Sequence, residues 1–284
     1  MTPRGLGLAA LLAGGACIAL SPIFVRLSDT SPAASAFWRV ALAIPALWIW
    51  ARLTPAKSAP SNDLWKPLVL GGISFAGDLA LWHWSIAYTS VANATLEANF
   101  APIFVALGAW WLFAQRVSRA FVVALAITLI GAVILVGPNF ADRRALFGDA
   151  LGVGTAIFYA GYLLSVKTLI DRVSVARIAF ICTAITAVIL LPFAWFTAER
   201  FWPQSAYGWG VLIALALISH SAGQSLIAYG LGTVSAAVGS VTLLIQSVLA
   251  AVFAWIILSE LLGPVQMLGG AIVLLGIYLA RRAG

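Results

Sequence analysis

Long apolar stretches separated by short polar breaks run through the whole 284-residue chain. Each stretch holds about 18 to 25 residues, and a helix needs about 20 apolar residues to cross the hydrocarbon core of a bilayer. The breaks, such as residues 28–32 and 54–60, are rich in Pro, Ser and Asp, which end one helix and admit the next. The pattern predicts ten transmembrane helices, at residues 6–27, 33–53, 66–88, 91–113, 119–137, 147–169, 175–197, 208–229, 234–258 and 264–281.

The composition excludes a soluble protein. Hydrophobic residues make up 63% of the chain and charged residues 9%, with a mean hydropathy of +1.04. Soluble domains are about 45 to 50% apolar and about 25% charged, so the surface of this chain must be covered by lipid. We therefore predict an all-α integral membrane protein, whose partner is the lipid bilayer and which has no room for a separate catalytic domain.

The net charge of +7 comes from scattered bases, without a motif that would carry them to nucleic acid, so no nucleic-acid partner is expected. The two cysteines, Cys17 and Cys182, lie inside apolar stretches, where they are expected to behave as small hydrophobic residues. We predict neither a disulfide nor a metal site.

The basic residues indicate how the chain is oriented. With the N-terminus inside, eleven of the sixteen bases lie at the inner ends of the helices, and five of the nine acids lie at the outer ends. Lys and Arg near helix ends are retained on the cytoplasmic side of a membrane. Both termini are therefore predicted to be cytoplasmic.

The two halves of the chain resemble each other at an offset of 141 to 145 residues. The sequence Trp84–Tyr88 parallels Ser225–Tyr229, and residues 129–131 parallel residues 274–276. Five helices in each half make the second half enter the membrane from the opposite side, as in many transporters. We predict two inverted five-helix repeats, residues 1–140 and 145–284, within one membrane domain.

Several motifs resemble those of the drug/metabolite transporter superfamily of EamA type. They are Ser31-Pro32 with Phe37-Trp38-Arg39, residues 88–94, residues 101–104, and the last hairpin with Leu258-Ser259-Glu260, residues 266–270 and Leu275-Gly276. The resemblance covers the whole chain and implies ten helices in two five-helix repeats. Within the superfamily the chain is most similar to the bacterial YddG-type amino-acid exporters, which implies a location in the bacterial inner membrane.

Charged groups inside the apolar stretches are costly, so each one points to a function. Only Asp78, Glu97 and Arg39 lie well inside. Arg39, His83 and Glu97 are each about 10 Å below an outer turn, at 1.5 Å per residue, and could form one cluster. The alternative is a structural ion pair that holds the second, third and fourth helices together.

Further polar groups fall near the middle of the membrane, including Tyr159, Tyr162 and Gln246. Trp82 follows Asp78 by four residues and therefore shares its helix face. We expect Asp78 and Tyr159 to border one central cavity. Asn99 is among the further groups that could line it.

The inverted repeat relates two pairs of predicted gate residues, because His83 corresponds to Gln224 and Tyr88 to Tyr229. The predicted substrate-binding residues are Asp78, Trp82, His83, Glu97, Tyr159, Tyr162, Gln224 and Gln246. The residues predicted to pair helices or form gates are Arg39, Tyr88 and Tyr229.

Small residues recur every four positions along one predicted helix, at Gly148, Gly152, Ala156 and Ala160. This spacing lets another helix approach closely. We therefore predict that the helix at residues 147–169 lies inside the bundle.

Together these features predict a secondary transporter that exports small metabolites, amino acids foremost, by alternating access around the central cavity. No cofactor is expected, and if protons are coupled to transport, Asp78 and Glu97 are the candidate carriers. The oligomeric state stays open, and a monomer is compatible with the sequence.

Other functions are weighed as alternatives. Within the same class, a multidrug exporter, another metabolite carrier or an uncoupled facilitator would fit, although a nucleotide-sugar carrier would favour central bases and no Lys lies there. An intramembrane enzyme is disfavoured because no cysteine lies near a base and no pair of aspartates shares a helix face. A channel is disfavoured because all loops are short.

Overall fold

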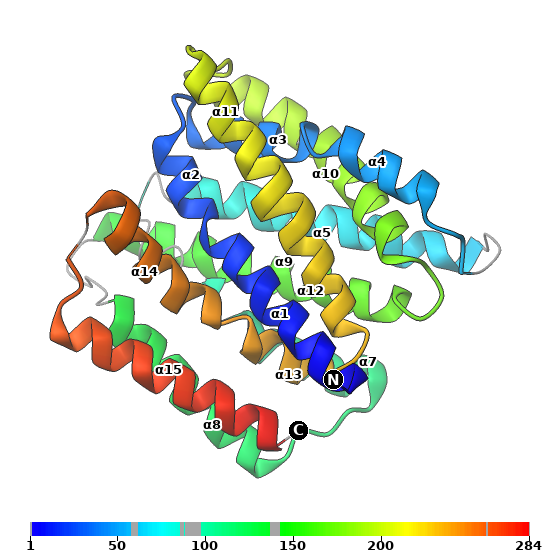
Figure 1. Ribbon diagram of the computed structural model, residues 1–284, viewed down its shortest axis with the longest axis vertical. Coiled ribbons are helices and arrows are strands. Elements are labelled where there is room, and N and C mark those ends of the chain that lie inside the picture. Colours follow the sequence, from blue (N-terminus) through cyan, green and yellow to red (C-terminus); the bar gives the residue numbers. More distant parts are fainter. Residues whose placement is uncertain are drawn as a thin grey trace.

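The computed structural model describes residues 2–57, 62–85, 88, 98–136, 143–259 and 261–283, and over these residues every regular element is helical (Figure 1). The first half contains α1 (Pro3–Ala19), α2 (Ser21–Leu27), α3 (Pro32–Ala41), α4 (Ile44–Leu53), η1 (Asn62–Leu64), α5 (Trp65–Ser85), α7 (Ala101–Phe113) and α8 (Arg119–Val136). The second half contains α9 (Arg143–Leu169), α10 (Val175–Thr197), α11 (Ala206–Ala214), η2 (Leu215–Gly223), α12 (Gln224–Leu231), α13 (Ala236–Thr242), α14 (Ile245–Leu258) and α15 (Pro264–Ala283).

Eight segments are long and apolar enough to cross a membrane: Pro3–Leu27, Pro32–Leu53, Asn62–Ser85, Ala150–Leu169, Val175–Thr197, Ala206–Leu231, Ala236–Leu258 and Pro264–Ala283. Two shorter apolar helices, Ala101–Phe113 and Arg119–Leu135, fall within the other two predicted segments. The described part of the chain is thus a multi-pass helical membrane protein. Both chain ends lie toward the same end of the bundle (Figure 1).

Several predicted helices are interrupted, which the hydropathy pattern alone does not show. The first segment breaks at Leu20 and the second at residues 42–43, in each case next to a proline near the start of the following helix. Pro22 and Pro45 have no N–H to donate to the carbonyl four residues earlier, so the helix ladder is broken there. Residues 215–223 form a π-helix, η2, inside another predicted segment.

Two helix ends recur at the same spacing in both halves. Two-residue turns, at residues 99–100 and 243–244, precede α7 and α14. These helices end at Ala114 and Ser259, which are 145 residues apart and both left-handed, with φ of 52° and 57°. They are the two non-glycine residues with positive φ in the described part of the chain.

The helices α8 and α15 pack with their backbones in close contact. A Cβ atom at Gly131 would lie 2.6 Å from the backbone nitrogen of Val273, and one at Gly269 would lie 2.7 Å from the Cα of Leu135. Because the residue number rises along one helix as it falls along the other, the two helices are antiparallel. Small residues allow this approach in a membrane, where lipid offers no hydrophobic drive for helix pairing.

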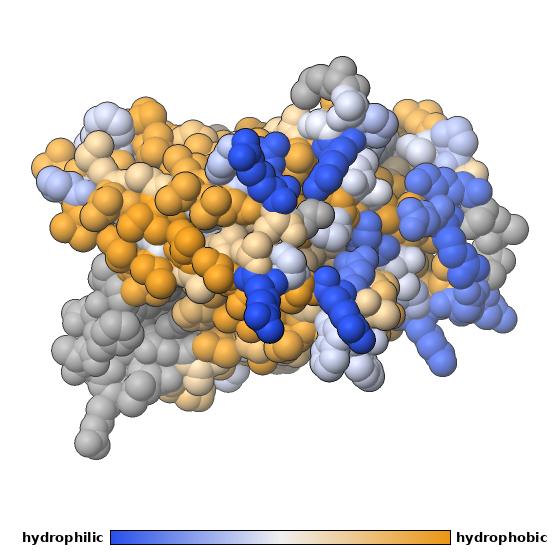
Figure 2. Space-filling view, turned by 90° about the horizontal axis from the view of Figure 1, so that it is seen from below, coloured by the Kyte–Doolittle hydropathy of each residue, from blue (hydrophilic) through white to orange (hydrophobic). Residues whose placement is uncertain are grey.

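The helix α9 lies inside the bundle and packs along α5. Gly154 meets Leu81 and Gly161 meets Ser74 on α5. The predicted small-residue stripe of Gly148, Gly152, Ala156 and Ala160 is buried, which confirms the interior position of this helix. Viewed from below (Figure 2), hydrophobic side chains cover much of one half of the molecule, while hydrophilic side chains gather over the other half.

Candidate functional site

Two of the helix interruptions border a cavity of about 100 Å³ in the interior of the bundle, here named the central cavity. Ile18, Ala19, Ser21 and Pro22 reach it from the α1–α2 break. Ala98 and Asn99 reach it from the residues just before α7. Its other lining residues are Arg39, Phe75, Asp78, Leu79, Trp82, Thr155, Tyr159, Gln224, Gln246 and Ala250.

One cation and one anion face the central cavity. Arg39 on α3 is 5% exposed, and its Nη1 donates a hydrogen bond to the Ser21 hydroxyl at 3.0 Å. The buried Arg39 Nε has no hydrogen-bond partner within the described residues. Asp78 on α5 lies close enough to interact electrostatically with this guanidinium. A buried charge without a nearby opposite charge is costly. Arg39 and Asp78 therefore each lower the free-energy cost of burying the other.

Uncharged polar groups complete one side of the cavity. The Tyr159 hydroxyl on α9 and Gln224 on α12 face each other, yet neither that hydroxyl nor Gln224 Oε1 has a well-formed hydrogen bond to another described group. Asn99 Nδ2 donates to Ser247 Oγ at 2.7 Å, which fixes the Asn99 side chain. Buried polar atoms are normally satisfied, so unsatisfied ones on a cavity wall are available to a ligand.

The remaining wall is apolar. Trp82 and Leu79 share a helix with Asp78, and Phe75 and Ile18 face the same space. The Trp82 ring packs edge-on against His83, with 4.8 Å between ring centroids. The cavity therefore offers charges and hydrogen-bonding groups on some sides and an apolar surface on another, which is typical of small-molecule sites.

The structure brings six of the predicted functional residues to this cavity: Arg39, Asp78, Trp82, Tyr159, Gln224 and Gln246. Tyr162 does not line the cavity and lies in the core, 3% exposed, stacked on Tyr159 and tilted against Phe75. His83 does not line the cavity either: it is buried, 3% exposed, with Nδ1 2.6 Å from the Leu79 carbonyl oxygen.

The predicted gate tyrosines lie away from the central cavity. Tyr88 is 41% exposed and packs against Phe147, with 5.0 Å between ring centroids. Tyr229 on α12 is 44% exposed. The prediction for Glu97 lies outside the described residues.

Two lining hydroxyls, Ser21 and Thr155, were not predicted from the sequence. Ser21 stands directly before Pro22, and a polar residue next to a proline inside an apolar stretch is a signal that could have identified it. Thr155 carries no such signal, because its hydroxyl donates to the Leu151 carbonyl in its own helix.

The two stacked tyrosines allow a matched test of the cavity. Replacing Tyr159 by phenylalanine removes an unsatisfied hydroxyl from a residue that lines the cavity, so we expect the KM of transport to rise about two- to tenfold, the value of one hydrogen bond. Tyr162→Phe removes a core hydroxyl from the neighbouring ring and is expected to leave KM unchanged. Equal effects of both variants on KM in a vesicle transport assay would contradict this assignment.

The described residues contain no group of three or more His, Cys, Asp or Glu side chains placed to hold a metal ion. A membrane-spanning helical bundle with a small cavity between its helices, lined by charged, polar and apolar groups, has the architecture of a small-molecule carrier. The chain belongs to the EamA-like transporter family, whose sequence profile matches residues 5–137 and 146–282. It is a multi-pass membrane transporter and not an enzyme.

Two relatives named as exporters are similar to this chain over nearly their whole length. The pseudopaline exporter CntI of Pseudomonas aeruginosa strain UCBPP-PA14 is 27% identical over 94% of this chain and 92% of its own. A protein of Streptantibioticus cattleyicolor named "Probable terminal-alkyne amino-acid exporter" is 23% identical over 93% of this chain and 89% of its own. A crystal structure with 18% sequence identity matches 99% of this chain and 98% of that one with a TM-score of 0.79, which shows the same fold.

Proposed function

We propose that this protein is a secondary exporter of small zwitterionic metabolites, amino acids foremost, which bind in the central cavity. The observation that carries the proposal is that Arg39 and Asp78 face one small cavity. The Arg39 guanidinium would hold the substrate carboxylate and the Asp78 carboxylate its ammonium group. Trp82 would pack against the substrate side chain, while Tyr159, Gln224 and Gln246 would hydrogen-bond its polar ends.

The names of two relatives support export as the direction of transport. One is named as an exporter of pseudopaline and the other as a probable exporter of an amino acid. Another metabolite or multidrug exporter is the alternative within the family. A central site with one base and one acid favours zwitterions over substrates that carry phosphate groups.

We also propose that residues 1–140 and 145–284 are two inverted five-helix repeats, making ten transmembrane helices. The matching left-handed helix ends support this repeat. Contacts between α8 and α15 are also reciprocal: Gly131 approaches the backbone nitrogen of Val273, and Gly276 approaches that of Thr128, at the same offset of 145 residues. Reciprocal contacts between antiparallel helices are expected across a two-fold axis perpendicular to both.

We propose that transport proceeds by alternating access, in which one repeat rocks against the other around a cavity between them. The central cavity takes residues from both halves, among them Asp78 and Tyr159. In this mechanism the outer gate would include His83 and Tyr88. The inner gate would include their counterparts in the second repeat, Gln224 and Tyr229.

The proposed location is the bacterial inner membrane, with both termini in the cytoplasm, which the distribution of basic residues supports. We propose that a monomer suffices, because the described residues that line the cavity belong to a single chain. No cofactor is needed. Coupling to protons would use Asp78, with Glu97 as a second carrier, whereas a facilitator would need no titrating group.

Efflux from reconstituted vesicles tests the proposal. Vesicles loaded with a panel of labelled amino acids are expected to show saturable efflux that an imposed pH gradient changes. Saturable efflux that is indifferent to pH would indicate a facilitator. If no amino acid is transported while the reconstituted protein is correctly folded, the substrate class is wrong.

A further inference from the structure

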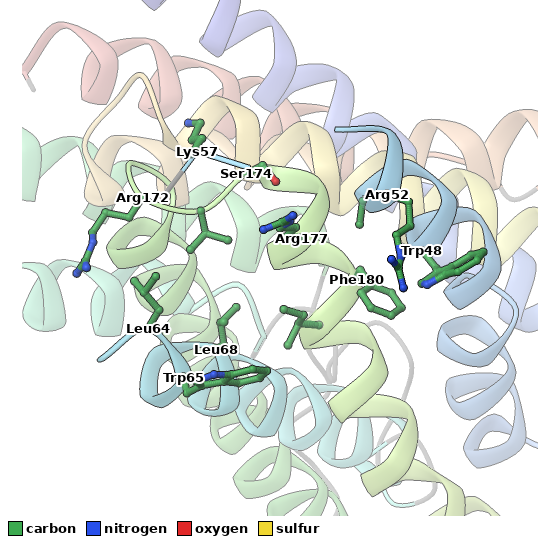
Figure 3. A pocket seen from close by; sticks show the side chains of 13 residues that line it. Trp48, Arg52, Lys57, Leu64, Trp65, Leu68, Arg172, Ser174, Arg177 and Phe180 are labelled. Atoms are coloured by element: carbon green, nitrogen blue, oxygen red, sulfur yellow. The ribbon is translucent and has the colours of Figure 1, made fainter. Parts of the chain in front are cut away.

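A second cavity, of about 460 Å³, opens between α4, α5 and α10 and is here named the α10 pocket. It shares no lining residue with the central cavity. Figure 3 shows Ser174 and Arg177 at the start of α10, with Arg52 and Trp48 of α4 and Trp65 of α5 around the same space. The pocket therefore lies where one membrane-spanning helix ends and two others begin.

The α10 pocket is strongly basic. Its charged lining residues are Arg52, Lys57, Arg172 and Arg177, and none of the described lining residues is acidic. Arg172 is paired with Asp63, with 2.5 Å between Nη1 and Oδ2, and Lys57 Nζ donates to the Ile170 carbonyl at 2.9 Å. Within the described residues, neither Arg52 nor Arg177 forms an ion pair. The pocket thus carries an uncompensated positive charge that favours an anion.

The first turn of α10 provides a second and independent anion-binding feature. Ser174 occupies the N-cap position, but its side chain accepts no capping hydrogen bond from the helix. Its hydroxyl is buried, with the residue 4% exposed, and has no hydrogen-bond partner within the described residues. The first turn also lacks an acidic residue. Free backbone N–H groups and the helix dipole make such an N-terminus a site for phosphate.

The rest of the pocket is apolar. Trp48 and Trp65 are 46% and 52% exposed, and Leu68, Phe180 and Ile181 complete the wall. Tryptophan rings of this kind typically lie at the level of the lipid headgroups. A water-soluble phosphate compound would leave this apolar surface unused, whereas a phospholipid would cover it with its acyl chains.

We propose that the α10 pocket binds an anionic phospholipid. Its phosphate lies against the Ser174 hydroxyl and the N-terminus of α10, between Arg52 and Arg177, and its acyl chains run along Trp48 and Trp65. Basic pockets between transmembrane helices recognise anionic headgroups in this way. The bound lipid ties α4 and α5 to α10, so it stabilises the packing of the two halves of the chain. This inference does not depend on the proposed substrate.

The test is a titration of delipidated, detergent-solubilised protein with phosphatidylglycerol or phosphatidylcholine. The unfolding temperature reports binding, because a ligand that binds the folded state raises the stability of the protein. Lipid adducts counted in native mass spectra give the binding constant. Phosphatidylglycerol is expected to raise the unfolding temperature and phosphatidylcholine is not. Ser174→Ala together with Arg177→Gln should weaken phosphatidylglycerol binding by about tenfold or more, the value of a charge-assisted hydrogen bond.

Arg281→Gln is the matched control, because it removes one base at the end of α15, outside the pocket. It should leave the binding constant unchanged. Arg52→Gln, at an exposed position on α4, should weaken binding and provides a second test if the Arg177 variant is unstable. The proposal would be overturned if both lipids bound equally well, or if the Arg281 variant lost as much phosphatidylglycerol binding as the Ser174/Arg177 variant. It would also be overturned if inorganic phosphate alone raised the unfolding temperature as much as phosphatidylglycerol does.

Discussion

Replacing Gly269 by alanine is expected to lower the unfolding temperature of the purified protein by about 2 to 12 °C, or to prevent folding. A Cβ atom at this position would lie 2.7 Å from the Cα of Leu135 and even closer to its backbone nitrogen. Backbone atoms cannot rotate away as a flexible side chain can, so α8 and α15 must separate. Overpacking of this kind costs about 1 to 3 kcal/mol, and each kcal/mol shifts the unfolding temperature by about 2 to 4 °C.

The neighbouring glycine supplies the control. A Cβ atom at Gly270 would meet Val248 Cγ1 at 3.6 Å and Leu135 Cδ1 at 3.9 Å, which are ordinary van der Waals distances. Gly270→Ala should therefore fold as the wild type does. The unfolding temperature of both variants is measured by heating samples in detergent and determining the remaining folded fraction by size-exclusion chromatography. A Gly269 variant as stable as the Gly270 variant would show that the close contact of α8 with α15 is wrong.

Asp78→Asn is expected to reduce the kcat/KM of substrate efflux by about 30-fold or more. The variant keeps the side-chain shape but removes the anion that faces Arg39 and would hold the substrate ammonium group. Removing one of two opposite charges that face the same buried site leaves the other without compensation, at a cost of about 2 kcal/mol or more. Any dependence of efflux on an imposed pH gradient should also disappear, if Asp78 carries the coupled proton.

Two further variants separate transport from folding. In Arg39→Gln with Asp78→Asn, neither charge remains, so stability should recover relative to the single Asp78 variant while efflux stays low. The Asp63 side chain is 59% exposed and lies outside the central cavity. Asp63→Asn should therefore leave efflux unchanged. A folded Asp78→Asn protein with wild-type efflux would remove Asp78 from the substrate site.

The sequence alone determined the class of this protein and the position of its apolar helices. Burying about 20 apolar residues in lipid is so favourable that composition and hydropathy predicted the eight segments that are long and apolar enough to cross a membrane. A local rule also placed Trp82 on the same side of its helix as Asp78, because residues four apart lie above one another. Both side chains line the central cavity.

Only the tertiary structure decided which side of each helix faces the cavity. Tyr159 and Tyr162 are three residues apart on one helix, yet only Tyr159 lines the cavity, while Tyr162 packs in the core. Lipid and the protein interior are both apolar, so a hydrophobic pattern cannot distinguish the face that meets a neighbouring helix from the face that meets lipid. The hydrogen bond from Arg39 to Ser21 joins two helices that are separate along the chain, and no local pattern in the sequence records it.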